Sequence, residues 1–163
     1  MASIINVDQI NEATSGHLVR IPGHVIQCVH TSSTASQTST SSSFVDMTNM
    51  TLNITPKATN SLIFISASLA FAAQRTSTDV HASTQLLRDS TVIAGKDLRT
   101  YDYGTSGVYI NTELGYSIVD QPSTTSAVTY KFQMRKVAAN TNAASLNAES
   151  GCRSSIVIME IAQ

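Results

Sequence analysis

Three side chains near the start of the chain have donor atoms that could bind a metal ion. His24, Cys28 and His30 share parity, so on a regular strand all three project from one face. Copies of this face could share an ion around an oligomer axis, since imidazole and thiolate are zinc ligands. The set lacks a carboxylate and any spacing typical of zinc sites, however, so a sheet face of small and polar residues is the simpler interpretation. We therefore expect no metal and no cofactor.

The residues that hydrolytic enzymes use do not form a known pattern here. Serine and threonine are abundant, but no Gly-x-Ser-x-Gly motif occurs, and the four histidines show no order typical of a catalytic triad. Asp97 and Asp102 are close in sequence and could hold a sugar or a cation, although such residues are more often solvated turn formers. A depolymerase would need a groove with paired carboxylates, which no segment indicates. The sequence predicts a protein that is not an enzyme.

A tyrosine-rich segment is the best candidate for a recognition surface. Residues 96–107 read KDLRTYDYGTSG, which predicts an exposed loop. Aromatic faces beside planar polar groups are typical of surfaces that bind sugars or proteins. The alternative is that the tyrosines cover a loop or a subunit interface. The predicted contacts to a ligand or receptor are Lys96, Asp97, Arg99, Tyr101, Asp102, Tyr103 and Tyr109.

Strands must position this segment, and the segment 51–71 is the clearest evidence for them. Hydrophobic residues recur at every second position in 52–54 and again in 63–69, with turn residues such as Pro56 between the two runs. This pattern predicts a hairpin. Because residues 62–65 are continuously apolar, we expect the second strand to be central and buried on both faces or nearly so.

The rest of the chain repeats the pattern of short alternating strands. Residues 127–137 alternate most regularly, and Val128, Tyr130, Phe132 and Met134 are predicted to face the core. No long period of 3.6 appears, so the sequence predicts an all-β antiparallel sandwich of the jelly-roll type. Further strands are expected at 24–31, 44–47, 49–55, 80–87, 91–93, 108–119 and 153–162, and a Ser/Thr-rich exposed loop at 32–43.

Composition excludes several classes of partner. The 163 residues carry a formal net charge of −1 with scattered basic residues, so neither nucleic acid nor a membrane is an expected partner. Residues 1–9 lack the features of a signal peptide, which predicts synthesis in a cytoplasm. Cys28 and Cys152 are expected to be free thiols with small, buried side chains.

Residues 1–22 form a separate N-terminal arm in this interpretation, and residues 23–163 form the domain. The arm is too short for a core of its own and should gain order by packing on a neighbour. We expect it to attach the domain to another protein, through Ile4, Ile5, Val7, Ile10, Leu18, Val19 and Ile21. A strand that completes the chain's own sheet is the alternative.

A series of short motifs occurs in order along the domain. The motifs are Phe44-Val45-Asp46, Ile54-Thr55-Pro56, Asn60-Ser61, Leu86-Leu87-Arg88-Asp89-Ser90, Tyr116, Asp120-Gln121-Pro122-Ser123-Thr124-Thr125, Tyr130-Lys131 and Ile158-Met159-Glu160-Ile161. This combination resembles the knob domains of tail fibres and related virion proteins of tailed bacteriophages, many of them marine or cyanobacterial. The match spans about residues 23–163, and residues 5–8 and 14–16 are similar to the attachment segments that begin such proteins.

This resemblance implies a homotrimer of β-sandwich knobs, located in the virion and made in the host cytoplasm. As the knob of a tail fibre or head fibre, it would contact the host surface, with a cell-surface glycan as the ligand. The arm would then bind another virion protein of the capsid or tail. The alternative function is a capsid decoration, or cement, protein that clamps the shell at three-fold positions without a ligand.

Overall fold

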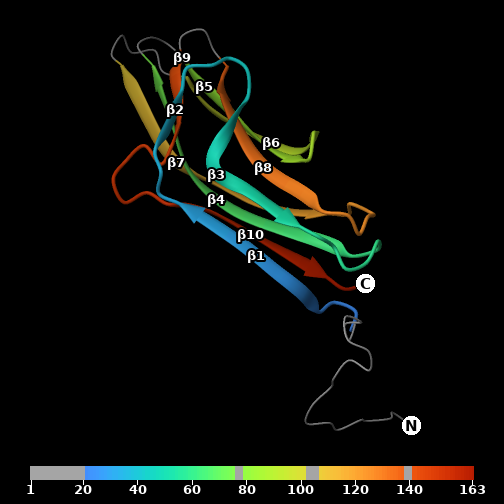
Figure 1. The fold of residues 1–163 in the computed structure, drawn as a ribbon. Coiled ribbons are helices and arrows are strands. Elements are labelled where there is room, and N and C mark those ends of the chain that lie inside the picture. The colour runs from blue at the N-terminus through green and yellow to red at the C-terminus, as the bar shows by residue number, and fades with distance from the viewer. Residues whose placement is uncertain (1–20, 76–78, 102–106, 138–140) are drawn as a thin grey trace, which may run out of the picture.

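The chain folds into two antiparallel β-sheets that pack face to face (Figure 1). The computed structural model describes residues 21–75, 79–101, 107–137 and 141–163. Within these ranges there is no helix, and so none that could cross a membrane. The strands are β1 (Val25–Ser33), β2 (Gln37–Ser39), β3 (Val45–Ile54), β4 (Leu62–Arg75), β5 (Asp79–Arg88), β6 (Thr91–Tyr101), β7 (Val108–Asp120), β8 (Val128–Lys136), β9 (Thr141–Leu146) and β10 (Ser154–Ile161).

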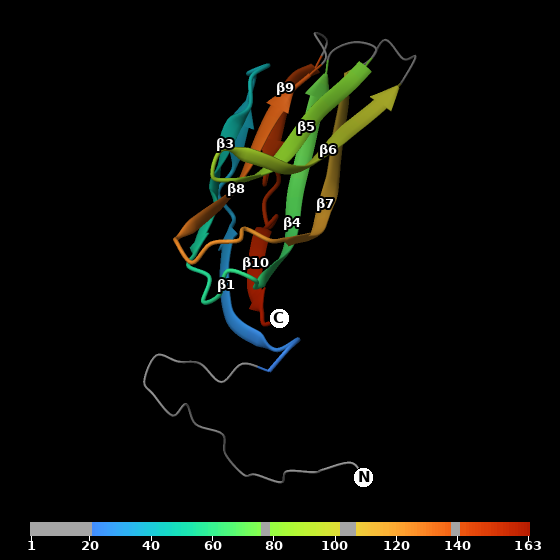
Figure 2. The same ribbon diagram turned by 90° about the vertical axis from the view of Figure 1, so that its right-hand side faces the viewer.

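The order of the strands is that of a jelly roll. Without the two short strands β2 and β9, one sheet has the order β1-β10-β4-β7 and the other β3-β8-β5-β6. The pairing is nested, because the first of these eight strands pairs with the last, the second with the seventh, the third with the sixth and the fourth with the fifth. Figure 2 shows the four-stranded sheet in front of the other. The predicted antiparallel sandwich of jelly-roll type is confirmed.

Strand β4 is the centre of the larger sheet, as predicted. It pairs with β7 along one edge from Ile63 to Arg75, and with β10 and then β9 along the other. Ile63 and Ile65 are fully buried in the core between the sheets. Leu62 and Phe64 point away from the core and are only half-buried. The expected burial of both faces therefore holds for the inner face alone.

The predicted hairpin in residues 51–71 is wrong, because its two strands belong to different sheets. Ile54 at the end of β3 pairs with Val128 of β8, whereas β4 lies in the six-stranded sheet. The buried carboxylate of Glu160 holds the connection, since it accepts the backbone N–H of Lys57 at 2.7 Å and a hydrogen bond from Gln27 Nε2 at 2.5 Å. A period of two shows which side chains share a face, but it does not identify the neighbouring strand.

The predicted loop at 32–43 is also wrong in part. It contains the end of β1 and all of β2, and both Ser33 and Ser39 are buried. Hydroxyl groups stabilise this polar part of the sheet, because Thr38 Oγ1 and Ser145 Oγ lie 3.0 Å apart on β2 and β9. The strands expected at 44–47 and 49–55 are one strand, β3, which is interrupted by a register shift around Asn49 with its positive φ of 60°.

The core consists of the residues that alternation predicts on β8. Val128, Tyr130, Phe132 and Met134 are all at most 2% exposed. The ring of Phe132 meets that of Tyr116 from the opposite sheet edge-on, with centroids 4.8 Å apart. Strand β9, which no hydrophobic alternation in the sequence indicates, packs through small residues such as Ala144.

Both cysteine thiols are free, as predicted, but Cys28 is more exposed than we expected. Cys28 is exposed and Cys152 is half-buried, so the prediction of a buried side chain is wrong for Cys28. Its strand is an edge of the six-stranded sheet, and Cys28 and His30 are both exposed on the outer face. His24 precedes a register shift between Val25 and Gln27, so the predicted common face of His24, Cys28 and His30 is wrong for His24. In the part of the chain that the structure describes, no three His, Cys, Asp or Glu side chains come together as a metal site would need.

An ion pair joins the two sheets at one end of the core. Arg88 Nη1 on β5 donates to both carboxylate oxygens of Asp120 on β7, at 2.8 and 2.9 Å. The hydroxyl of Tyr130 on β8 donates to the same carboxylate at 2.7 Å. Burial raises the pKa of Tyr130 above its ordinary 10.0, and the adjacent carboxylate raises it further.

We expect the domain to lose stability in alkaline solution. The pKa of Tyr130 is higher in the folded chain than in the unfolded chain, so its contribution is complete below about pH 10 and is lost as the pH rises further. Burial raises the pKa of Tyr116 in the same direction. Melting temperatures should fall above about pH 10, and less steeply in Tyr130→Phe. A melting temperature that stays constant up to about pH 12 would contradict this account.

Candidate functional site

The outer face of the four-stranded sheet carries two groups of polar contacts, the first of them around Asp46. Asp46 on β3 accepts hydrogen bonds from Gln133 Nε2 at 2.6 Å and from Lys131 Nζ at 3.0 Å, both on β8. Gln85 Nε2 on β5 then donates to Gln133 Oε1 at 2.6 Å. The hydrogen bond from Gln133, with Lys131 beside it, lowers the pKa of Asp46. This face therefore offers fixed charges and amides on a rigid sheet.

The second group lies around Asp97 on β6, next to two side chains of β5. Ser83 Oγ donates to Asp97 Oδ1 at 2.6 Å, and His81 Nε2 lies 3.4 Å from Asp97 Oδ2. The hydrogen bond from Ser83 lowers the pKa of Asp97, and His81 and Arg135 act in the same direction. The three groups are not a triad, because the carboxylate lies between the serine and the histidine and the serine donates to it. The arrangement keeps Asp97 ionised and available to hydrogen-bond donors.

Arg135 and Phe44 form the side of the same site that lies towards β3 and β8. The guanidinium carbon of Arg135 is 4.4 Å from the ring centroid of Phe44, a cation–π contact. Arg135 Nε is buried and has no hydrogen-bond partner among the described residues. The charge of this guanidinium also acts on Asp97 and lowers the pKa of that carboxyl group.

These groups surround a hollow of about 370 Å³ that opens to solvent. We call it the β6 hollow, and its lining residues are Phe44, Ser83, Thr84, Gln85, Val92, Gly95, Lys96, Asp97 and Arg135. Val92 is 53% exposed and adds an apolar surface. Carboxylate, guanidinium and amide groups around an apolar surface can bind a small polyhydroxylated molecule by directed hydrogen bonds.

The structure places only part of the predicted recognition segment at this hollow. Residues 96–101 are strand rather than loop, because Asp97 pairs with Ser83 in a ladder that extends to Tyr101. Asp97 and Arg99 are exposed on the outer face. The side chain of Lys96 instead reaches across to β7, where Nζ donates to the carbonyl of Gly115 and lies 5.1 Å from the ring centroid of Tyr116. Asp102 and Tyr103 lie outside the described residues.

Tyr109 is not part of the same surface. It lies on β7 opposite Gln74 and is 44% exposed on the outer face of the six-stranded sheet. Burial and the nearby carboxylate of Glu149 raise its pKa. The predicted grouping of Tyr109 with Asp97 and Arg99 is therefore wrong, because the two sheets present these residues on opposite sides of the sandwich.

A second hollow, of about 540 Å³, lies on the six-stranded sheet around Gly115. Small side chains line most of it, including Ser66, Ser117 and Ser155. Its carboxylate, Glu113, accepts a hydrogen bond from Ser68 Oγ at 2.6 Å. With few functional groups and no residue from the predicted recognition segment except Lys96, it is the weaker candidate.

Neither a protein-family model nor a curated protein sequence matches this chain. Among solved structures, the VP2 subviral particle of infectious bursal disease virus is 16% identical with a TM-score of 0.43, over 85% of this chain and 33% of that one. T=1 particles derived from the same virus are 11% identical with a TM-score of 0.39, over 96% of this chain and 41% of that one. Dimeric latent PorU from Porphyromonas gingivalis is 9% identical with a TM-score of 0.45, over 94% of this chain and 14% of that one. This chain spans less than half the length of each, and similarities this low assign it no function.

Several residues of the β6 hollow were not singled out from the sequence. Arg135 had a usable signal, because the alternation of β8 already places it on the solvated face with Lys131 and Gln133. Ser83 alternates with the buried Ala82 and Thr84, which suggests an outward position. Phe44 precedes β3, and no local pattern connects it with Arg135.

Proposed function

We propose that this chain is a non-enzymatic structural protein of a bacteriophage virion, the knob of a tail fibre or head fibre, which contacts the host surface as a homotrimer. The observation that carries this proposal is the β6 hollow, where Asp97 and Arg135 adjoin an apolar surface. The proposed ligand is a glycan of the host cell surface. The resemblance of the sequence motifs to phage knob domains gives the proposal its biological setting.

The chemistry of the hollow suits a sugar. Asp97 can accept hydrogen bonds from vicinal hydroxyl groups, and the guanidinium of Arg135 can donate to ring or hydroxyl oxygens. Val92 can contact the apolar face of a pyranose ring. A hollow of this size binds a single sugar weakly, so three copies in one knob would raise the avidity for a surface that carries many glycans.

The decoration function remains the second candidate because of one observation. The outer face of the six-stranded sheet exposes apolar side chains, of which Val119 is 58% and Val25 52% exposed. A capsid shell could cover this face, which a fibre knob would leave in solvent.

Binding to a panel of immobilised bacterial glycans tests the ligand. We expect Asp97→Ala and Arg135→Ala each to weaken binding by about 10- to 100-fold, since each removes a hydrogen bond to a charged group. The matched control is Arg153→Ala, which removes an exposed arginine near the start of β10. Equal binding by all three variants and the parent chain would exclude the hollow as the site.

Cryo-electron microscopy of the intact particle tests the location. A few trimeric copies at the tip of a fibre would support the knob. Many copies distributed over the shell lattice would contradict it and favour the decoration function. Light scattering of the purified protein measures the trimer independently, and a monomer at all concentrations would exclude a homotrimer.

A further inference from the structure

One face of the sandwich carries an apolar surface that the described residues leave open. On the outer face of the six-stranded sheet, the directly paired residues Cys28, Met159, Phe64 and Val119 cross β1, β10, β4 and β7 in one row. The adjacent row contains Val25 and Ile161. We call these six residues the outer patch. Val25, Cys28 and Val119 are exposed, and the other three are half-buried.

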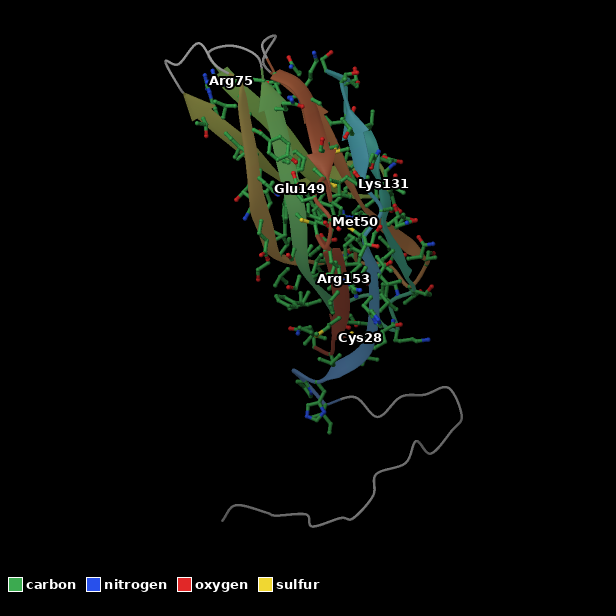
Figure 3. The ribbon with its side chains drawn as sticks, turned by 90° about the vertical axis from the view of Figure 1, so that its left-hand side faces the viewer. Cys28, Met50, Arg75, Lys131, Glu149 and Arg153 are labelled. Carbon is green, nitrogen blue, oxygen red and sulfur yellow. The ribbon has the colours of Figure 1, made fainter. Side chains whose placement is uncertain are left out.

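The described chain begins beside the outer patch. The N–H of Gly23 donates to the carbonyl of Ala162 at 2.8 Å, and the N–H of Ala162 donates to the carbonyl of His24 at 2.9 Å. These bonds fix the first described residues next to the end of β10, where Ile161 belongs to the patch. Figure 3, which looks onto this sheet, shows Cys28 low on β1 near the same end of the domain. Ile21 is itself 39% exposed.

The chain before this point has the length and composition to cover the patch. Strands in a sheet lie about 4.8 Å apart, so the row from β1 to β7 is roughly 15 Å wide. An extended segment spans about 3.3 Å per residue, and fewer than ten residues could cross it. The arm before Ile21 offers Leu18 and Val19 close to the entry, with Ile4, Ile5, Val7 and Ile10 further out.

We propose that residues 1–20 pack as a strap on the outer patch of their own chain. The tether favours this occupant, because a segment attached next to its binding surface is present at an effective concentration that a separate molecule seldom reaches. Leu18 and Val19 would contact the row of Val25 and Ile161 first, since only Arg20 and Ile21 separate them from the fixed turn. This inference does not depend on the glycan-binding hollow, which lies on the opposite sheet.

In this proposal the arm packs on its own domain instead of attaching it to another virion protein. The outer patch is then covered by the arm and does not contact a capsid shell. If the strap occupies the patch in the isolated protein, the apolar face no longer favours the decoration function. The hydrophobic residues of the arm are then part of the domain's own packing, as in the alternative in which the arm completes its own sheet.

The reactivity of Cys28 with a thiol reagent such as Ellman's reagent tests the strap, because this thiol belongs to the patch. Cys152→Ser makes Cys28 the single cysteine. We expect the full chain to react at least about tenfold more slowly than the same protein lacking residues 1–20, at every protein concentration over a roughly hundredfold range. Leu18→Asp with Val19→Asp should reproduce the fast reaction, whereas Ser15→Asp, a polar position in the same arm, should not.

Equal rates for the full-length and shortened proteins would overturn the proposal. So would protection that disappears on dilution, which indicates the arm of a second copy, or protection that requires another virion protein. Thermal melting of each variant checks that the domain is folded, and Cys152→Ser, which all the variants share, is the one change within the described residues. A negative result here leaves the glycan-binding test unaffected, since that test measures Asp97 and Arg135.

Discussion

Replacement of Ile65 by aspartate should leave no folded domain. Ile65 is fully buried at the centre of β4, between Ile158 of β10 and Ile118 of β7. An unpaired carboxylate at this position costs several kcal/mol in addition to the lost hydrophobic burial, which is comparable with the entire stability of a domain, about 5–15 kcal/mol. Circular dichroism and thermal melting of Ile65→Asp should show no cooperative transition.

The same substitution one residue earlier is the matched control. Phe64 points out of the sandwich and is half-buried, so Phe64→Asp can keep its charge in contact with water. We expect Phe64→Asp to remain folded with a lower melting temperature. A cooperative transition in Ile65→Asp, or unfolding of Phe64→Asp alone, would contradict the assignment of the inner and outer faces of β4.

Removal of Asp120 should strongly destabilise the domain, because this carboxylate joins the two sheets. The carboxylate is 13% exposed and accepts three hydrogen bonds, two from Arg88 and one from Tyr130. Asp120→Ala leaves the Arg88 guanidinium, 27% exposed, without its counter-charge and costs about 3 kcal/mol. The melting temperature should fall by roughly 10 °C in a domain of this size.

A second ion pair provides the comparison for Asp120. Asp46 and Lys131 are 54% and 25% exposed, so their attraction is screened and Asp46→Ala should cost less than about 1 kcal/mol. Urea denaturation at neutral pH measures both free energies of unfolding. Equal costs for the two substitutions would show that the Asp120 cluster does not join the sheets in the way its geometry indicates.

The strands could be predicted because burial on one face leaves a period of two in the sequence. The residues of β8 alternate so regularly that Tyr130 and Met134 were placed in the core correctly. The partner of each strand leaves no such trace, which is why β3 and β4 were taken for a hairpin although they lie in different sheets. Polar strands such as β2 were missed because hydroxyl pairs, rather than apolar side chains, hold them in place.

The candidate site was harder to predict, because strands distant in the sequence assemble it. Asp97 was named from its neighbours in the chain, but its partner Ser83 and the nearby Arg135 come from two other strands. Tyr109 shows the opposite error, since closeness in sequence suggested a shared surface and the fold separates it from Asp97. Because β6 and β7 belong to different sheets, residues that are close in the sequence lie on opposite sides of the sandwich, and no local pattern indicates this.

The nested order of the strands constrains how the chain reaches its native state. Strand β1 forms its ladder with β10, so Val25 has no partner until Ile161, which lies far along the chain, has been synthesised. Contacts this distant in sequence have a high loop-closure cost, and folds that depend on them assemble in milliseconds to seconds rather than microseconds. Until β10 is synthesised, β1 lacks its partner and one edge of β4 is open between Leu62 and Ser68. A nascent chain of this protein is therefore prone to aggregation until β10 has been synthesised.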